Sequence, residues 1–272
     1  MSRAYSLAYL TAYTCTPPEM IRVASLAGYD FVGMRLWPNA PGAPQQFLIG
    51  KPDVLRETLA VQKDTGVGVF DLEIIRIGAD FDPAVYRPLL DAGAALGARA
   101  ALIAADDTDE IRLVDSYAKL CEFMLPYGIT ADLEFMPWTA VKTANDAVRV
   151  IQSAGRPSNA GILVDALHFG RSHTTLADIK AIPRELLHYA QICDAEAGTH
   201  FTTVQLIHTA REERFLPGEG NIDARGLFEA LRFDLPMSVE IVHKPRMAGM
   251  SALAWASLCL SSAHQLLPRR PL

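Results

Sequence analysis

Acidic and amide side chains follow four successive apolar segments in the second half of the chain. They are Glu134, Asp165, Gln191 and Glu240. If the segments are neighbouring parallel strands, these side chains meet at one rim, where carboxylates repel one another and are costly to desolvate. A divalent cation relieves both costs, and oxygen donors favour Mn²⁺ or Mg²⁺, with Zn²⁺, Co²⁺ or iron as alternatives. The pattern therefore predicts one divalent cation, with Mn²⁺ as the preferred ion.

A histidine three residues after one of these acids adds a second functional group. In the stretch GILVDALHFG, Asp165 ends the apolar run and His168 follows it. Either both side chains hold one cation, or Asp165 holds the cation while His168 reaches a substrate. The structural alternatives are a helix cap for Asp165 and a loop histidine without a role.

The elements that must position these residues alternate along the chain. Eight short segments rich in Val, Ile and Leu are expected as strands of a parallel sheet covered on both faces. They span residues 6–10, 31–36, 67–75, 98–105, 128–135, 159–166, 189–195 and 237–242. Ile103, Glu134 and Asp165 are spaced 31 residues apart, about the length of one βα unit. The chain of 272 residues therefore predicts an α/β fold, a single (β/α)8 TIM barrel over residues 1–272, with its active site at the carboxyl ends of strands five to eight.

Helical patterns separate several of the strands, at residues 17–28, 53–66, 139–155 and 250–267. In the third of these, Thr139 is expected as the N-cap. A doubly wound sheet is the alternative fold, and it is disfavoured because no Gly-rich turn follows the first strand. The Pro-rich segment 37–47 is expected as a long loop on the active face.

Composition limits the classes of function. Half of the residues are hydrophobic, which supplies a large core, and the net charge of −6 with a pI near 5.6 offers no broad basic face for nucleic acid. No apolar stretch is long enough to cross a membrane, and the N-terminus is a poor secretory signal. The four cysteines are far apart in the sequence and form no CxxC motif, so free thiols and a cytoplasmic location are expected.

Five stretches carry a resemblance to a known family. They read LEFMPW, GILVDALHFGRS, YAQICDAE, RFLPGEGNID and MSVEIVHK. In them the chain resembles the xylose-isomerase-like TIM-barrel superfamily, the sugar phosphate isomerase/epimerase family. The resemblance implies metal ligands at Glu134, Asp165, Gln191 and Glu240. It also implies that His168 and Arg214 contact the substrate.

Two positions depart from the family pattern. Many members have histidine where this chain has Gln191, and an amide oxygen is a harder, neutral ligand that lowers the expected affinity for zinc. Family 3-dehydroshikimate dehydratases tend to have histidine where this chain has Met136. This second departure weakens the resemblance to the dehydratases.

The resemblance implies a divalent-metal-dependent isomerase or epimerase that acts on a sugar or related polyhydroxy carbonyl compound through a metal-stabilised enediolate. Glu134 and Glu240 are expected on strands three apart around the barrel, and we predict that they remove and return the proton. Expulsion of a leaving group from the same enolate, as in a dehydratase or lyase, is the alternative. A catalytically silent sugar-binding barrel is the second alternative.

The first half of the chain adds charged candidates for substrate binding. Arg35, Glu73 and Arg76 stand near the ends of strands two and three, where they either face the pocket or form an internal ion pair. If the arginines face the pocket, the substrate carries a carboxylate or a phosphate. Trp138 is a candidate wall for a sugar ring. The expected partner is a small-molecule substrate, with neither nucleic acid nor membrane, in a homodimer or homotetramer.

Overall fold

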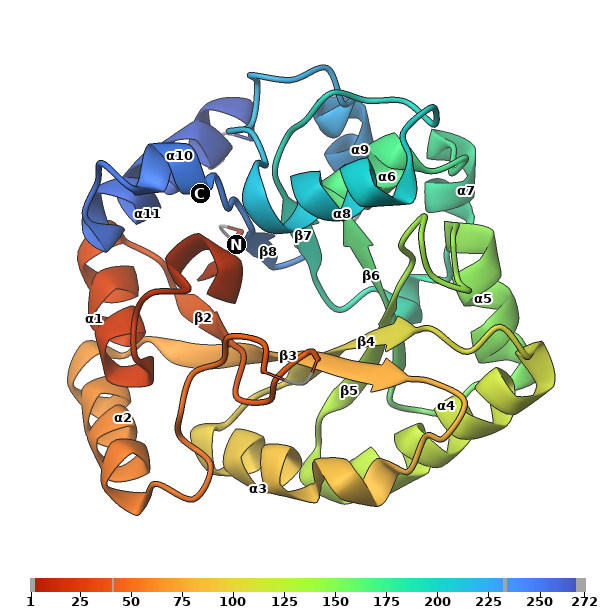
Figure 1. Ribbon diagram of the computed structural model, residues 1–272, viewed down its shortest axis with the longest axis horizontal. Helices are drawn as coiled ribbons and strands as arrows, with labels where there is room; N and C mark the ends of the chain where they lie inside the picture. The colour runs from red at the N-terminus through yellow and green to blue at the C-terminus, as the bar shows by residue number, and fades with distance from the viewer. Residues whose placement is uncertain (1–2, 41, 232–233, 268–272) are drawn as a thin grey trace.

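Eight parallel strands close into a barrel in the order of the chain, and the last strand pairs with the first (Figure 1). The computed structural model describes residues 3–40, 42–231 and 234–267. The strands are β1 (Tyr5–Leu7), β2 (Phe31–Met34), β3 (Gly68–Ile77), β4 (Ala100–Ala105), β5 (Thr130–Glu134), β6 (Ala160–Asp165), β7 (Ala190–Ile192) and β8 (Met237–Val239). The predicted (β/α)8 TIM barrel is confirmed.

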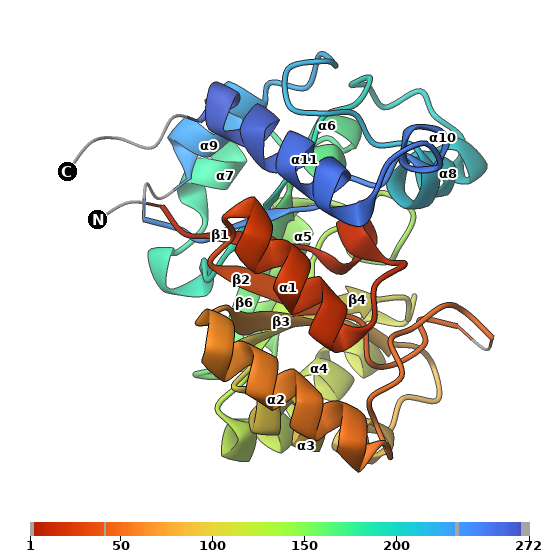
Figure 2. The ribbon, with the colours of Figure 1, turned by 90° about the vertical axis from the view of Figure 1, so that its left-hand side faces the viewer.

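Helices surround the barrel and return the chain from one strand to the next. The α-helices are α1 (Pro17–Ala27), α2 (Pro52–Thr65), α3 (Arg87–Leu96), α4 (Glu110–Met124), α5 (Ala144–Ser153), α6 (Ala166–Arg171), α7 (Leu176–Ala181), α8 (Thr203–Glu212), α9 (Ala224–Ala230), α10 (Lys244–Met247) and α11 (Ala252–Leu266). Short 3₁₀ turns are η1 (Tyr9–Ala12), η2 (Pro83–Tyr86), η3 (Leu125–Tyr127) and η4 (Arg184–Leu186). Figure 2 shows α11, α1 and α2 packed side by side on one flank. In the described part of the chain, the helices are too short or too polar to cross a membrane.

The start predicted for the third helical segment is wrong. The helix begins at Ala144, and its N-cap is Thr143, whose side chain accepts from the Asp146 N–H while the Asp146 carboxylate accepts from the Thr143 N–H. Thr139 lies in the preceding loop, where its hydroxyl is 2.9 Å from the carbonyl oxygen of Met136. The capping box Thr-x-x-Asp is the sequence signal that selects the later start.

Strand alternation decides which side chains enter the barrel. On β6, Ile162 and Val164 belong to the large apolar cluster under the helices, whereas Leu163 belongs to a smaller cluster that also holds Leu102 and Ala104 of β4. Since successive side chains of a strand point to opposite faces, Asp165 shares the inner face with Leu163. The same alternation places Glu134 inside on β5, where it pairs with Leu163 in register.

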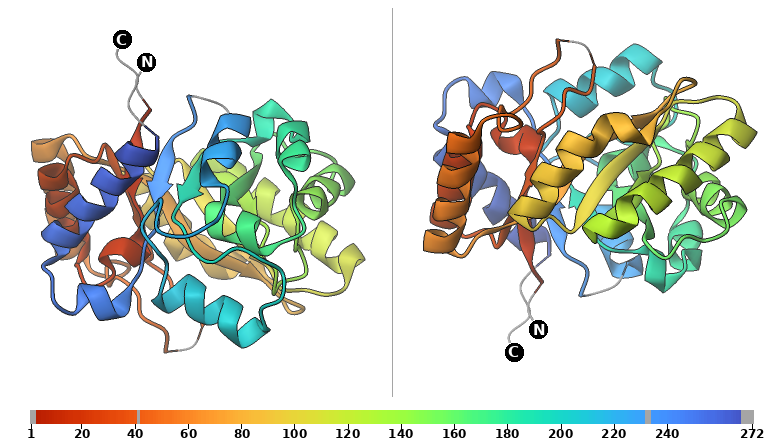
Figure 3. Two further views of the ribbon diagram at one scale, coloured as in Figure 1. Left: turned by 90° about the horizontal axis from the view of Figure 1, so that it is seen from above. Right: turned by 90° about the horizontal axis from the view of Figure 1, so that it is seen from below.

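The start of β1 and the end of α11 lie on the face of the barrel opposite to helix α8 (Figure 3). Because all strands run in parallel, their carboxyl ends share the α8 face. Glu134 and Asp165 are the last residues of their strands, and Glu240 immediately follows β8. The topology therefore brings these acids to one mouth.

Gly161 is required by close packing inside the barrel. A Cβ atom there would lie 2.1 Å from Asp132 Oδ1 and 2.4 Å from His188 Nδ1, two atoms that are themselves 2.7 Å apart. We expect Gly161→Ala to lower the free energy of unfolding by about 2 kcal/mol through overpacking. Gly78→Ala is the matched control, because the space around Gly78 is open, and its effect should stay within about 0.5 kcal/mol. Urea unfolding measures both, and equal stabilities of the two variants would contradict the packing argument.

Candidate metal centre

Three of the predicted residues converge at the carboxyl ends of β5 and β6. Glu134, Asp165 and His168 are buried, and one potential ligand atom from each lies within 4.8 Å of the other two. Among the described residues, this is the one group of His, Cys, Asp and Glu with such spacing. The His168 Nε2 atom is 3.6 Å from Glu134 Oε1. The donor set fits a divalent cation.

Gln191 of β7 lies against the same acids, as predicted. With its amide nitrogen turned toward them, Gln191 donates to Glu134 Oε1 at 3.1 Å and to Asp165 Oδ2 at 3.0 Å. With its oxygen turned toward them, Gln191 would present the atom that the predicted metal ligand needs. Hydrogen bonding favours the first orientation, because carboxylates repel a carbonyl oxygen.

Arg214 joins the cluster through two short ion pairs. Its Nη1 is 2.6 Å from Asp165 Oδ2, and its Nη2 is 2.6 Å from Glu240 Oε2. All three side chains are almost fully buried. Glu240 is therefore linked to the other acids through the guanidinium group. The arrangement brings Arg214 to the acids that were predicted to bind metal.

The backbone around Arg214 is fixed between the ends of two strands. Its N–H donates to the carbonyl oxygen of Val242 at 2.7 Å, and Phe215 exchanges two backbone hydrogen bonds with Asp194. The Asp194 carboxylate also accepts from the backbone N–H groups of Gly218 and Gly220, both at 3.0 Å. Loop anchoring is thus the role of Asp194, and it holds the Arg214 side chain at the mouth.

The other predicted substrate-binding residues, Arg35, Glu73, Arg76 and Trp138, have different partners. Arg35 donates to Glu73 at 2.8 Å, the internal ion pair that was one of the two alternatives. Arg76 instead forms a two-bonded pair with Asp106. Trp138 lies beside the cluster, with its ring edge-on to the ring of His168 at 5.0 Å.

A cavity of about 230 Å³ opens next to Arg35. Its walls come from η1, the β2–α2 loop, α8 and α10, and include Tyr9, Arg35, Arg211 and Lys244. The Arg35 guanidinium stacks on the ring of Tyr9, 4.5 Å from its centroid. Three cationic side chains and Glu212 therefore line this cavity. The described parts of the Pro-rich loop help to form it, as expected of a loop on the active face.

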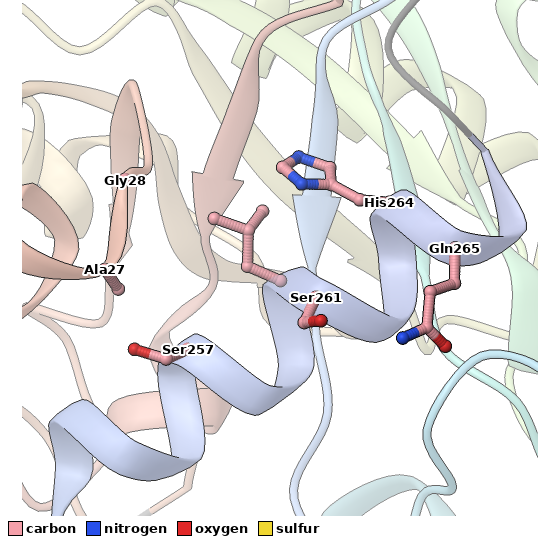
Figure 4. Close-up of a pocket in the computed structure, with 7 residues that line it drawn as sticks. Ala27, Gly28, Ser257, Ser261, His264 and Gln265 are labelled. Atoms are coloured by element: carbon pink, nitrogen blue, oxygen red, sulfur yellow. The ribbon is translucent and has the colours of Figure 1, made fainter.

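A larger groove of about 520 Å³ lies outside the barrel, between the end of α1 and α11 (Figure 4). From α11, it is lined by Ser257, Ser261, His264 and Gln265. The ring of His264 packs edge-on against Tyr5 at 4.7 Å. None of the predicted site residues lines this groove.

A second layer of buried acids beneath the mouth was missed in the sequence. Asp71 and Asp132 are fully buried, and burial, with Glu73 and Asp132 adding to it, raises the pKa of Asp71. Strand periodicity could have found both, because Asp71 and Asp132 stand two residues before Glu73 and Glu134 and so share their faces. The interior of this barrel is therefore acidic over two layers.

Residues 21–257 match the model of the family described as xylose isomerase-like TIM barrel. The chain belongs to this family. No curated protein sequence matches the chain. This membership agrees with the predicted resemblance.

Solved structures of the same fold cover nearly the whole chain. The IOLI protein with a bound zinc atom aligns with a TM-score of 0.76 at 18% identity, over 97% of this chain and 98% of its own. D-allulose 3-epimerase from Methylomonas sp. aligns with 0.70 at 16%, over 98% of each chain. The probable 3-DHS dehydratase AsbF from Bacillus anthracis aligns with 0.75 at 12%, over 96% of this chain and 98% of its own. At these identities the likeness shows the fold.

Burial and the guanidinium shift the pKa values of the acids in different directions. Burial raises the pKa of Glu134, and Asp165 and Glu240 add to the rise. Burial also raises the pKa of Glu240 against the opposing effect of Arg214. For Asp165, burial is outweighed by Arg214, His168 and the Leu167 N–H, so its pKa is lowered. Burial lowers the pKa of His168 to about 4, so His168 is neutral at neutral pH.

These shifts predict that stabilisation by metal grows with pH. Because the pKa values of Glu134 and Glu240 are raised on folding, the folded protein without metal holds protons that the unfolded chain releases, and its stability falls as pH rises through the folded values. A divalent cation competes with those protons for the carboxylates. The rise in Tm caused by Mn²⁺ should therefore be larger at about pH 8 than at about pH 6. Thermal unfolding with and without Mn²⁺ measures it, with KCl of matched ionic strength as the control, and an equal rise at both pH values would contradict the assignment.

Proposed function

We propose that this protein is a divalent-metal-dependent isomerase or epimerase of a sugar or related polyhydroxy carbonyl compound. The observation that carries the proposal is the convergence of Glu134, Asp165 and His168, with Gln191 against them, at the mouth of a xylose isomerase-like barrel. Two of the structures that share the fold are of an epimerase for D-allulose and of a protein with bound zinc. Mn²⁺ is the proposed ion because the donors are mainly hard oxygens.

The reaction begins with removal of a proton from the carbon next to the substrate carbonyl. Glu134, Asp165, Gln191 and Glu240 would hold the cation, which supplies positive charge beside the developing enediolate. Glu134 and Glu240 stand on β5 and next to β8, and we assign them the transfer of the proton. We assign neutral His168, whose ring lies edge-on to Trp138, a hydrogen bond to a substrate oxygen.

The cavity next to Arg35 supports an anionic substrate as an extension of this proposal. Arg35, Arg211 and Lys244 face it, and Lys244 is paired with Glu212 at 2.6 Å. A carboxylate or phosphate on the substrate would meet these cations while its carbonyl end lies at the acids. The cytoplasmic location and the homo-oligomeric state remain predictions.

The test of the reaction class is incubation with Mn²⁺ in D₂O. The panel contains neutral ketoses, phosphorylated and acidic sugars, keto acids and 3-dehydroshikimate, analysed by mass spectrometry and NMR. Isomerisation or epimerisation leaves solvent deuterium next to the carbonyl in a product of otherwise unchanged composition. Loss of water from a substrate would instead establish the dehydratase alternative. The absence of deuterium exchange and of product across the panel, together with no effect of Mn²⁺ on Tm, would favour a silent sugar-binding barrel.

Replacing either proposed acid–base residue should abolish turnover. Glu134→Gln and Glu240→Gln keep the size of the side chain but cannot accept the proton, so we expect kcat to fall by about 10²-fold or more. Glu122→Gln on the exposed face of α4 is the control and should leave kcat unchanged. Near-normal kcat for Glu240→Gln in correctly folded protein would remove Glu240 from the acid–base role.

A further inference from the structure

The cluster of buried acids already contains a cation that belongs to the chain. The guanidinium of Arg214 bridges Asp165 at the end of β6 and Glu240 beyond β8, with both contacts at 2.6 Å. In a buried setting such charge-assisted hydrogen bonds are strong, because neither carboxylate has water as an alternative partner. Arg214 therefore neutralises part of the charge that a metal would neutralise.

Both carboxylate oxygens of Asp165 already accept hydrogen bonds, which limits how a metal could coordinate them. Its Oδ1 atom accepts the Leu167 N–H at 2.6 Å, as the N-cap of α6. Its Oδ2 atom accepts from Arg214 and lies 3.0 Å from the Gln191 amide nitrogen in the orientation that hydrogen bonding favours. Both oxygens are thus engaged by N–H donors. A cation that coordinates Asp165 must displace or share one of these donors.

Gln191 adds to the same arrangement. Its amide nitrogen donates to Glu134 and Asp165 when it faces the cluster, whereas a metal would require the amide oxygen to face inward. Two side chains, Arg214 and Gln191, therefore satisfy the acids by hydrogen bonding. Both must rearrange when the acids coordinate a cation.

We propose that Arg214 is a built-in competitor for the metal site, whose guanidinium must leave Asp165 or Glu240 before both acids can bind a divalent cation. This inference rests on the proposed metal-dependent function. Its consequence is a coupling: entry of the metal releases guanidinium N–H groups, which are then free to bind an oxygen of the substrate. The tight ion pairs also make the metal site of the wild-type protein weaker than its ligand set alone would give.

The rearrangement is confined to the side chain. The Arg214 backbone N–H is bonded to Val242, and its neighbour Phe215 is paired with Asp194. Its Nε donates to the carbonyl oxygen of Ala210, one turn back along α8. With the backbone held on both sides, the guanidinium can change partners by rotation about its side-chain bonds without moving the loop.

Titration calorimetry with Mn²⁺ at one fixed pH tests the competition. Arg214→Met removes the guanidinium and keeps an unbranched side chain, so we expect its Kd for Mn²⁺ to be at least about tenfold lower than that of the wild type. Arg225→Met is the matched control. It removes the same charge from α9, where Arg225 is exposed, and no ion pair between it and the cluster is found among the described residues. Its Kd should stay within about twofold of wild type, as expected for an exposed charge.

The outcomes separate this inference from the proposed function. If the wild type and Arg214→Met bind Mn²⁺ equally, or the variant binds more weakly, the competition is wrong while a metal-dependent function can stand. If the wild type binds no Mn²⁺ and the variant does, the competition is right and the metal-dependent function is wrong. Should Arg214→Met fail to fold, Arg214→Lys replaces it, because one ammonium cannot span both acids with the fork of a guanidinium. A Kd for Arg214→Lys no lower than that of the wild type would then overturn the inference.

Discussion

The site is governed by the cost of burying three carboxylates within reach of one another. Glu134, Asp165 and Glu240 have lost contact with water, and each ionised acid raises the cost of ionising the next. Arg214 supplies a single positive charge, and its hydrogen bonds, together with the Leu167 N–H, keep Asp165 ionised. The other two acids are left with raised pKa values. The lower pKa of Asp165 therefore also depends on the Leu167 N–H and on His168, because the Arg214 guanidinium holds a position at which it contacts Asp165 and Glu240 at the same distance.

That position depends on the loop after α8 more than on the barrel itself. The segment that carries Arg214 runs between the extensions of β7 and β8, where Glu213 pairs with His243 and Phe215 with Asp194. The Asp194 carboxylate in turn collects several backbone N–H groups of the loop. Asp194, which accepts hydrogen bonds from the loop backbone, thus fixes the loop that carries Arg214. The strands position the carboxylates at the mouth of the barrel, and this loop positions the positive charge of Arg214 beside them.

The sequence predicted those parts of the structure that depend on local pattern. Eight apolar segments with a βα spacing gave the closed barrel, and residues at strand ends gave Glu134, Asp165 and Gln191 at one mouth. Arg214 was predicted from a resemblance as a substrate contact, but its pairing with Asp165 joins residues 49 positions apart, which no local pattern encodes. The pairing of Arg76 with Asp106 was missed for the same reason. Thr139 was preferred over Thr143 as a helix cap although the capping box favoured Thr143.

The side chains around the acids also bear on the proposed reaction, because an enolate can either regain a proton at carbon or expel a leaving group. Elimination needs a proton donor at the leaving group, whereas isomerisation needs a proton returned to carbon. Met136, at the position where the dehydratases of the family tend to have histidine, is buried in the apolar cluster within the barrel and has no proton to give. The raised pKa values make Glu134 and Glu240 stronger proton acceptors than ordinary glutamates, which suits the removal of a proton from carbon that we propose for them. The apolar Met136 and the two glutamates therefore fit the return of a proton to carbon in the isomerase or epimerase that we propose.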